Sequence, residues 1–262
     1  MLLRTFSISL VFLIFGVAQD FPSLDINRDD TRITVTNFAP GSQGARSVPR
    51  NPNCREGFNT AVFYGPVEGF VETISQDAKL LSSVVIIETP NPQEGEDNSE
   101  QDRVELFNAN LTFGRPPCIE TREDLDEPIR LEQGRTTIFG SSLILEPEEN
   151  IGDMTGPIEL NRAAQGDSPA LSADADEMAF NFDTEISVLK GNITVTSEDR
   201  VSNADELEFD EANGVAIMRG NPARSTQGSD FVEGNVIKYF LNNNDVVVIG
   251  GISGEINVDL ED

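Results

Sequence analysis

The chain has 262 residues, with 46 acidic and 18 basic side chains, no histidine and a formal net charge of −28. Phosphate contacts need clustered lysine and arginine, so this balance excludes a nucleic-acid-binding protein. The lack of histidine excludes Ser-His-Asp and Cys-His catalysis and the common zinc sites. We therefore expect no metal, no cofactor and no enzyme of these classes.

Residues 1–18 have the pattern of a secretory signal peptide. Arg4 precedes an apolar run over residues 6–15, and residues 16–18 supply the expected cleavage site after Ala18. The run is shorter than the roughly 20 residues that a transmembrane helix needs, although an uncleaved anchor is the alternative. The sequence therefore predicts an exported chain.

Residues 19–140 are predicted to form a divergent N-terminal part of a β domain. Apolar residues alternate there over short stretches, as is typical of strands, and these are residues 32–36, 67–72, 78–87 and 104–113. Between them lie polar segments with Pro and Gly, which we expect to be long loops: residues 39–59, 88–103 and 114–135.

Cys54 and Cys118 are the only two cysteines. An exported protein meets an oxidising environment, so we predict a disulfide between them. Two unlinked thiols are the alternative.

Residues 141–262 contain a recurring unit. Residues 176–192 align with residues 205–221 without a gap, and residues 141–157 and 235–251 fit the same frame more loosely. The closing glycines Gly156, Gly191, Gly220 and Gly251 are 35, 29 and 31 residues apart. A period near thirty predicts one stacked supersecondary unit, which favours a binding or scaffolding function over a compact catalytic pocket.

Each unit is predicted to be a hairpin with one apolar face, because apolar residues alternate on both sides of a polar turn. We expect the closing glycine to form a corner at which the strand crosses between two sheets. The fold class is therefore all-β, with two facing antiparallel sheets that bury the apolar faces between them. The predicted inward residues, which are also the candidate lipid-binding residues, are Leu143, Leu145, Met178, Phe180, Phe182, Ile186, Val188, Leu207, Phe209, Val215, Ile217, Ile237, Tyr239, Val246 and Val248.

The C-terminal residues are predicted to form a last strand that pairs with another subunit. Ile256, Val258 and Leu260 alternate there, and the acidic neighbours would discourage indiscriminate edge pairing.

The recurring unit has a defined frame: Ala-Asp-Glu, two alternating apolar residues, a turn, two more alternating apolar residues, and then Lys or Arg, Gly and Asn. This frame resembles the OstA-like family. It occurs at residues 175–192 and 204–221. The resemblance implies an LptA-like periplasmic protein of lipopolysaccharide transport, folded as an elongated β-jellyroll whose interior carries acyl chains. It further implies head-to-tail self-association and partners among other OstA-like envelope transport proteins.

The resulting hypothesis is a non-enzymatic bridge or carrier for lipopolysaccharide or a related envelope glycolipid. A structural β-repeat protein with a filled core is the main alternative. A polysaccharide-degrading enzyme that uses paired carboxylates is a third, since 46 acidic residues do not single out a pair.

Overall fold

The computed structural model describes residues 23–28, 31–37, 58–65, 71–75, 78–90, 102–114, 118–166, 168–241 and 245–255. These residues form strands and turns, with no helix among them, which confirms the predicted all-β class. The signal peptide predicted at residues 1–18 lies outside the described residues. Across the ranges given above, no helical segment has the length and hydropathy needed to span a bilayer.

The chain divides into two compact units. Unit 1 comprises residues 1–131 and 146–148, and unit 2 comprises residues 132–145 and 149–262. The strands of unit 1 are β1 (Ser23–Arg28), β2 (Thr31–Asn37), β3 (Phe58–Tyr64), β4 (Val71–Ser75), β5 (Ala78–Ser82), β6 (Val84–Pro90), β7 (Arg103–Phe107), β8 (Ala109–Phe113) and β9 (Ile119–Asp124).

Two strands, β10 (Ile129–Gln133) and β12 (Ser142–Glu146), have residues in both units. The strands of unit 2 are β11 (Thr136–Gly140), β13 (Ile151–Arg162), β14 (Leu171–Asn181), β15 (Ile186–Ser197), β16 (Arg200–Asp210), β17 (Val215–Gln227), β18 (Asp230–Phe240), β19 (Asp245–Ile249) and β20 (Ser253–Glu255).

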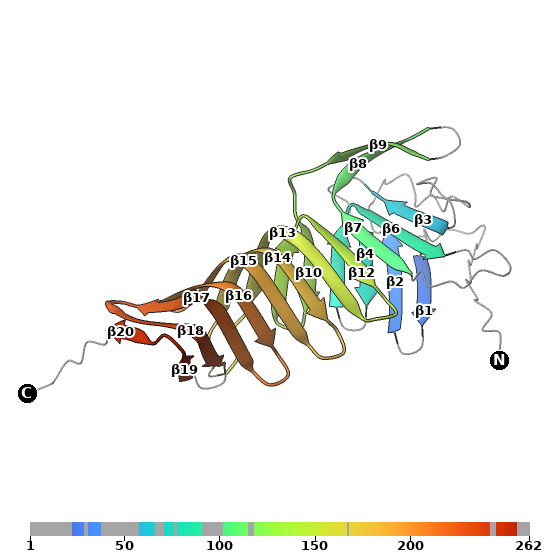
Figure 1. The fold of residues 1–262 in the computed structure, drawn as a ribbon. Coiled ribbons are helices and arrows are strands. Elements are labelled where there is room, and N and C mark those ends of the chain that lie inside the picture. Colours follow the sequence, from blue (N-terminus) through green and yellow to red (C-terminus); the bar gives the residue numbers. More distant parts are fainter. Residues whose placement is uncertain are drawn as a thin grey trace, which may run out of the picture. The chain divides into compact units, whose positions relative to one another are not determined.

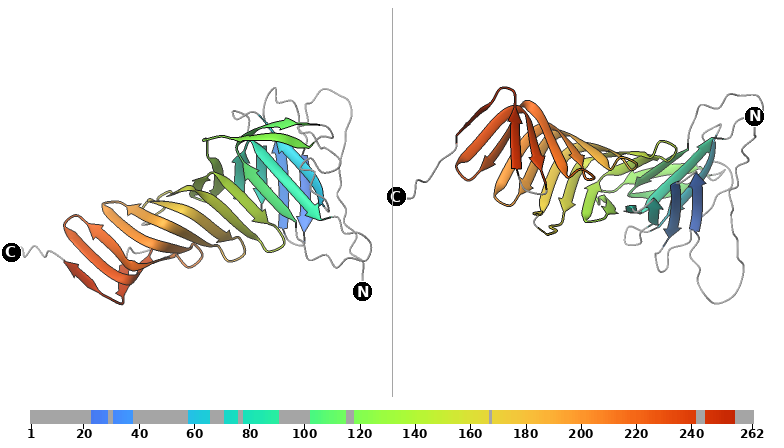
Figure 2. Two further views of the ribbon diagram at one scale, coloured as in Figure 1. Left: turned by 45° about the horizontal axis from the view of Figure 1, so that its top comes forward. Right: turned by 90° about the horizontal axis from the view of Figure 1, so that it is seen from below.

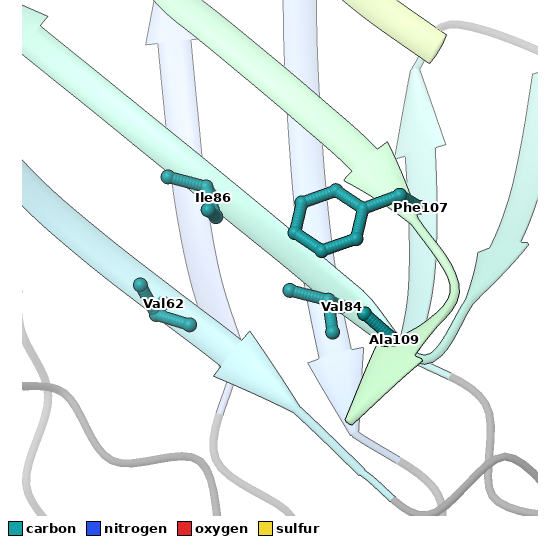
Figure 3. Close-up of a cluster of buried hydrophobic side chains, with 5 residues drawn as sticks. All are labelled: Val62, Val84, Ile86, Phe107 and Ala109. Atoms are coloured by element: carbon teal, nitrogen blue, oxygen red, sulfur yellow. The ribbon is translucent and has the colours of Figure 1, made fainter. Parts of the chain in front are cut away.

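Unit 1 contains two antiparallel strand runs, β1-β2-β4-β5 and β3-β6-β7, and a separate hairpin of β8 and β9. Strand β6 is buried on both faces. Its Val84 and Ile86 form a cluster with Val62, Phe107 and Ala109, against which the β8–β9 hairpin packs (Figure 3). This cluster gives unit 1 a core of its own.

Strands β9 and β10 occupy part of residues 114–135, which the sequence predicted as a loop. For β9 the prediction was wrong because this strand is exposed along nearly its whole length and shows no apolar alternation, whereas β10 does bury Ile129 and Leu131 at alternate positions. Pairing with β8 holds it in place, and Arg122 lies 3.5 Å from the centre of the Phe107 ring. A strand that is defined by its partner and not by a buried face has no signal in apolar periodicity.

In unit 2 the long strands β13 to β18 run side by side and pair antiparallel in sequence order (Figure 1). Every one of these pairings shifts register near its middle, for example between Lys190 and Ile193 of β15. The part of each strand on one side of the shift belongs to layer A, and the other part belongs to layer B. Layer A contains residues 151–155, 177–181, 186–190, 206–210, 215–219, 236–240 and 245–249, and layer B contains residues 158–162, 171–175, 193–197, 200–204, 223–227, 230–234 and 253–255.

The register shifts form one line of corners across unit 2, and the closing glycines lie on it. An added Cβ at Gly156 would overlap the carbonyl oxygen of Asp176, and Gly191 has a φ of +76°. These two positions therefore need glycine for a close approach and for a left-handed backbone. The result confirms the predicted β-jellyroll of stacked hairpins with two antiparallel sheets, and the register shifts place the crossing of the strands at the glycines. Figure 2 shows the long strands of unit 2 from two further directions.

The corner also explains the polar ends of the recurring motif. Asn192, which closes one copy, donates from Nδ2 to Asp176 Oδ2, which opens the same copy, at 2.7 Å. On the outer face of the next copy, Glu206 lies directly opposite Arg219 and the two side chains are 3.2 Å apart. In these two copies an acidic residue near the start is thus the cross-strand partner of the basic residue near the end, Glu177 of Lys190 and Glu206 of Arg219.

The hairpin turns of layer A repeat a side-chain cap. Asn181 accepts hydrogen bonds at Oδ1 from the backbone amides of Asp183 and Thr184, at 3.0 and 2.9 Å. In the next hairpin Asp210 accepts from the side chain and the backbone amide of Asn213, and these hydrogen bonds lower the pKa of Asp210. Both caps fix four-residue turns.

We expect Gly191→Ala to lower the free energy of unfolding by more than about 1–2 kcal/mol, the cost of a left-handed backbone at an ordinary residue, because the new methyl also meets Asp176. Urea denaturation measures the change. Gly134→Ala is the matched control, since Gly134 has a φ of +55° with nothing within 4 Å of the added Cβ. Equal losses for the two variants would show that the corner is not crowded.

Cys118 is disulfide-bonded, and Cys54, its predicted partner, lies outside the described residues. We expect the mature chain to gain no mass on alkylation without reductant and to gain two alkyl groups after reduction. Intact-mass spectrometry makes the measurement. Two modified thiols in the unreduced sample would contradict the predicted Cys54–Cys118 bridge.

Candidate functional site

The interior of unit 2 is lined by rows of side chains that run across the strands. In layer A, one row is Met154, Met178, Leu189, Leu207, Met218, Ile237 and Val248, and the next is Gly152, Phe180, Ser187, Phe209, Ala216, Tyr239 and Val246. In layer B, the facing row is Leu160, Ala173, Val195, Ser202, Ser225 and Val232. The interior is therefore apolar at one end and carries hydroxyl groups further along layer B.

A cavity lies between the two layers of unit 2. Its volume is about 560 Å³, the open mouth included. The apolar part of its wall comes from layer A through Leu207, Ala216 and Met218 and from layer B through Leu171 and Val195. Side chains of the two layers therefore do not fill all the space between them.

Arg162 is a buried cation in this wall. It is 3% exposed and occupies the last inward position of β13. Its Nε and Nη2 donate to the two carboxylate oxygens of Glu211, at 3.0 and 3.1 Å, and its Nη1 donates to Ser168 Oγ at 3.0 Å. The guanidinium is thus held by a bidentate carboxylate pair, the strongest arrangement open to arginine.

These contacts join the two layers at the side of the cavity. Glu211 lies in the turn between β16 and β17, at the end of layer A, while Arg162 ends the layer B part of β13. Ser168 Oγ also donates to the carbonyl oxygen of Leu241, in the turn after β18. Arg135 adds a second cation to Glu211 at 3.5 Å. We call Arg162, Ser168 and Glu211 the clasp.

A second polar group lines the cavity at layer B. Ser202, 2% exposed, donates to Ser225 Oγ at 3.1 Å and lies 2.7 Å from the hydroxyl of Tyr239. Arg200 donates from Nη2 to Gln227 Oε1 at 2.9 Å, and its Cζ is 5.6 Å from the centre of the Tyr239 ring. Ser197 is the cross-strand partner of Arg200. Hydroxyl and guanidinium donors therefore gather at one part of an otherwise apolar wall.

Most of the predicted inward residues are on the interior side of unit 2. Met178, Phe180, Leu207, Phe209 and Ile237 are buried in the layer A rows, where Tyr239, Val246 and Val248 continue the same rows. Leu143, Leu145 and Phe182 are also buried. Their contact with a lipid stays a prediction.

Four predicted inward residues lie on the outer face, and this part of the prediction was wrong. Val188 pairs with Ala179 and Ile217 pairs with Glu208, one position away from the inward rows. The two hairpins pair Asn181 with Ile186 and Asp210 with Val215 around four-residue turns, which set the parity of the following strand. The residues misplaced by one position are Ile186, Val188, Val215 and Ile217.

Sequence reasoning missed the residues that occupy the interior instead. Leu189, Ala216 and Met218 are buried in the rows, and the turn length was the signal that could have found them. The clasp gave no local signal, because Arg162 and Glu211 are 49 positions apart. The edge-strand residues Ile256, Val258 and Leu260 lie outside the described residues.

In the part of the chain that the structure describes, no group of three His, Cys, Asp or Glu side chains is arranged to hold a metal ion.

Residues 127–215 match the family model described as the LptA/(LptD N-terminal domain) LPS transport protein. This match confirms the resemblance to the OstA-like family over these residues, which include the clasp and most of the cavity wall. No curated protein matches the sequence. Among solved structures, LptH from Pseudomonas aeruginosa, the LptA-homologous periplasmic component of its lipopolysaccharide transport device, aligns with a TM-score of 0.41 and 10% identity over 47% of this chain and 95% of that chain.

We expect Glu211→Gln to lower the free energy of unfolding by about 1–3 kcal/mol, because it leaves a buried arginine with a neutral partner. The loss stays below that of a fully buried pair, since the Glu211 side chain is 37% exposed. Glu208→Gln is the control, because Glu208 pairs with Arg219 on the outer face and should cost under about 1 kcal/mol. Urea denaturation of both variants checks the difference, and equal losses would contradict a structural role for the clasp.

Proposed function

We propose that this chain is a periplasmic, non-enzymatic lipid-binding carrier or bridge in the transport of lipopolysaccharide or a related envelope glycolipid. The observation that carries the proposal is the cavity between the layers of unit 2. Part of its wall belongs to residues 127–215, which match a family of lipopolysaccharide-transport proteins.

The physical basis is the burial of hydrocarbon. Each square ångström of apolar surface that leaves water contributes about 25 cal/mol, so an acyl chain gains from contact with Leu171, Val195, Leu207 and Met218. The volume of about 560 Å³ includes space at the mouth that is open to solvent, so the enclosed part of the cavity is much smaller. One hydrocarbon chain, rather than a whole glycolipid, is the group that this cavity suits.

The arrangement of the rows supports transport rather than storage. The same inward positions recur from β13 to β18. The methionine, leucine and isoleucine side chains that would contact a hydrocarbon chain therefore continue in rows from the cavity onto the neighbouring strands. Direction would come from partner proteins, because the sequence has no phosphate-binding loop that would bind a nucleotide.

We propose that the partners include other OstA-like envelope transport proteins and further copies of this chain. The last described strands of unit 2 support an edge for such pairing, since Val247 and Ile249 of β19 are 44% and 55% exposed. An exposed apolar edge strand is a site for strand addition from another chain.

A photo-crosslinking amino acid at Tyr239 or Met218 should crosslink lipopolysaccharide or a related glycolipid in cells of the source organism. Both side chains line the cavity. The crosslinked product is detected as a lipid-bearing band on immunoblots and identified by mass spectrometry.

The controls are the next residues along the same strands, Lys238 and Ile217, whose side chains lie on the outer face. Each control residue is the immediate neighbour of a test residue on the same strand, and its side chain lies on the opposite face of the sheet. Crosslinking of lipid at the outer positions alone, or at neither set of positions, would contradict the proposed carrier function. Lipid on the inner positions alone supports it.

A further inference from the structure

One inward row of layer A alternates between small and aromatic side chains. Each member of the row lies directly opposite the next across a strand pair, and the members from β13 to β18 are Gly152, Phe180, Ser187, Phe209, Ala216 and Tyr239. The rings use the space that the small residues leave, since a Cβ added at Gly152 would overlap the Phe180 ring. The aromatic residues therefore decide whether the space beside each small residue stays open.

The cavity is open beside one of these small residues. Ala216 and Tyr239 line it, and the other members of the row do not. Phe180 fills the space at Gly152 and packs edge-on against Phe182, with the ring centres 4.8 Å apart. The layer A wall of the cavity accordingly comes from β16, β17 and β18, whereas the interior toward β14 is filled by aromatic rings.

Phe209 lies where the cavity ends. It is 5% exposed and does not line the cavity, but its neighbours do. Leu207 precedes it on the same face of β16, Ala216 lies directly opposite on β17, and Cζ of Arg162 is 5.5 Å from the ring centre. Ser187, its partner on β15, is outside the cavity wall. The Phe209 ring thus separates the open space at Ala216 from the filled interior.

The clasp gives this ring a fixed neighbour. Glu211 is two residues beyond Phe209, and its carboxylate accepts two hydrogen bonds from Arg162. Arg162 also donates to Ser168, so its guanidinium moves only when charge-assisted hydrogen bonds break. A cation within about 6 Å of the centre of an aromatic ring is attracted to its face. Phe209 is therefore a firm boundary of the cavity.

We propose that Phe209 sets the length of hydrocarbon chain that the cavity accepts. This inference rests on the proposed lipid-binding function and deepens it, because it assigns the selection of chain length to one side chain. The enclosed part of the cavity is small, since the volume of about 560 Å³ includes the open mouth. A chain that fills this part is stopped by the Phe209 ring, and any further methylene groups stay in water.

The test measures how 1-octanol, 1-decanol, 1-dodecanol and 1-tetradecanol bind to the purified mature chain. Each alkanol, below its solubility limit, competes with the fluorescent probe N-phenyl-1-naphthylamine, and the result is corrected for the affinity of the probe for each variant. Each buried methylene group improves affinity about fourfold, so affinity rises with chain length until the cavity is full and then stays constant. We expect the wild-type protein to reach this limit within the series.

Phe209→Ala should move the limit to a longer alkanol and raise the affinity for that alkanol by about tenfold or more, because removal of the ring extends the cavity toward Ser187. Phe209→Leu, which keeps more of the core volume, should move the limit less. Ala216→Leu should move it to a shorter alkanol, because Ala216 lines the cavity.

Phe63→Ala is the matched control. Phe63 is also 5% exposed, but it belongs to β3 of unit 1, so its loss should leave the length limit as in wild type. Circular dichroism and urea denaturation establish that each variant is folded. If Phe209→Ala does not fold, the opposite shifts expected of Phe209→Leu and Ala216→Leu decide the question.

Three results would overturn the role of Phe209 and leave the lipid-binding cavity intact. They are a wild-type affinity that rises through the whole series, a limit that the Phe209 variants leave unchanged, and a limit that Phe63→Ala shifts equally. If no alkanol binds to the wild-type protein, the proposed function itself is overturned, and this inference with it.

Discussion

The structure of unit 2 depends on the line of corners where each long strand passes from one layer to the other. A hairpin with a single apolar face needs a second layer to cover that face. The corner supplies that layer from the same strands. Gly156 and Gly191 make this possible, because the backbone approaches a neighbouring strand at the first and adopts a left-handed conformation at the second. Where the corners lie therefore decides which residues face one another across the interior.

The interior between the two layers of unit 2 is more polar than a packed core requires. Leu160, Ala173 and Val195 give way along layer B to Ser202 and Ser225, and Arg162 is buried with its carboxylate partner. Replacing buried ion pairs by hydrophobic residues of similar volume is often neutral or stabilising, so stability alone does not account for the clasp.

Apolar alternation and turn composition were enough to predict the class of fold, the hairpins and most of the buried aromatic residues. Phe180 and Phe209 carry this signal, because large apolar side chains at alternate positions are typical of a strand with one buried face. The outward positions of Val188 and Ile217 did not follow from their type, since β-branched residues suit either face of a strand. Their parity is set by the turns, and the pairing of Arg162 with Glu211 is set by how the two layers fold together. Neither is a property of a short window of sequence.

Each recurring unit contributes two strands, and this has a consequence for how such a chain can change its length. One unit, about thirty residues, carries the backbone from layer A to layer B and back, so that every later turn keeps its layer when a whole unit is gained or lost. A single added strand would exchange the layers of all that follows. Neighbouring strands lie about 4.8 Å apart, so length should vary in steps of roughly 10 Å along the interior, at constant width. The architecture therefore favours duplication of thirty residues over duplication of fifteen.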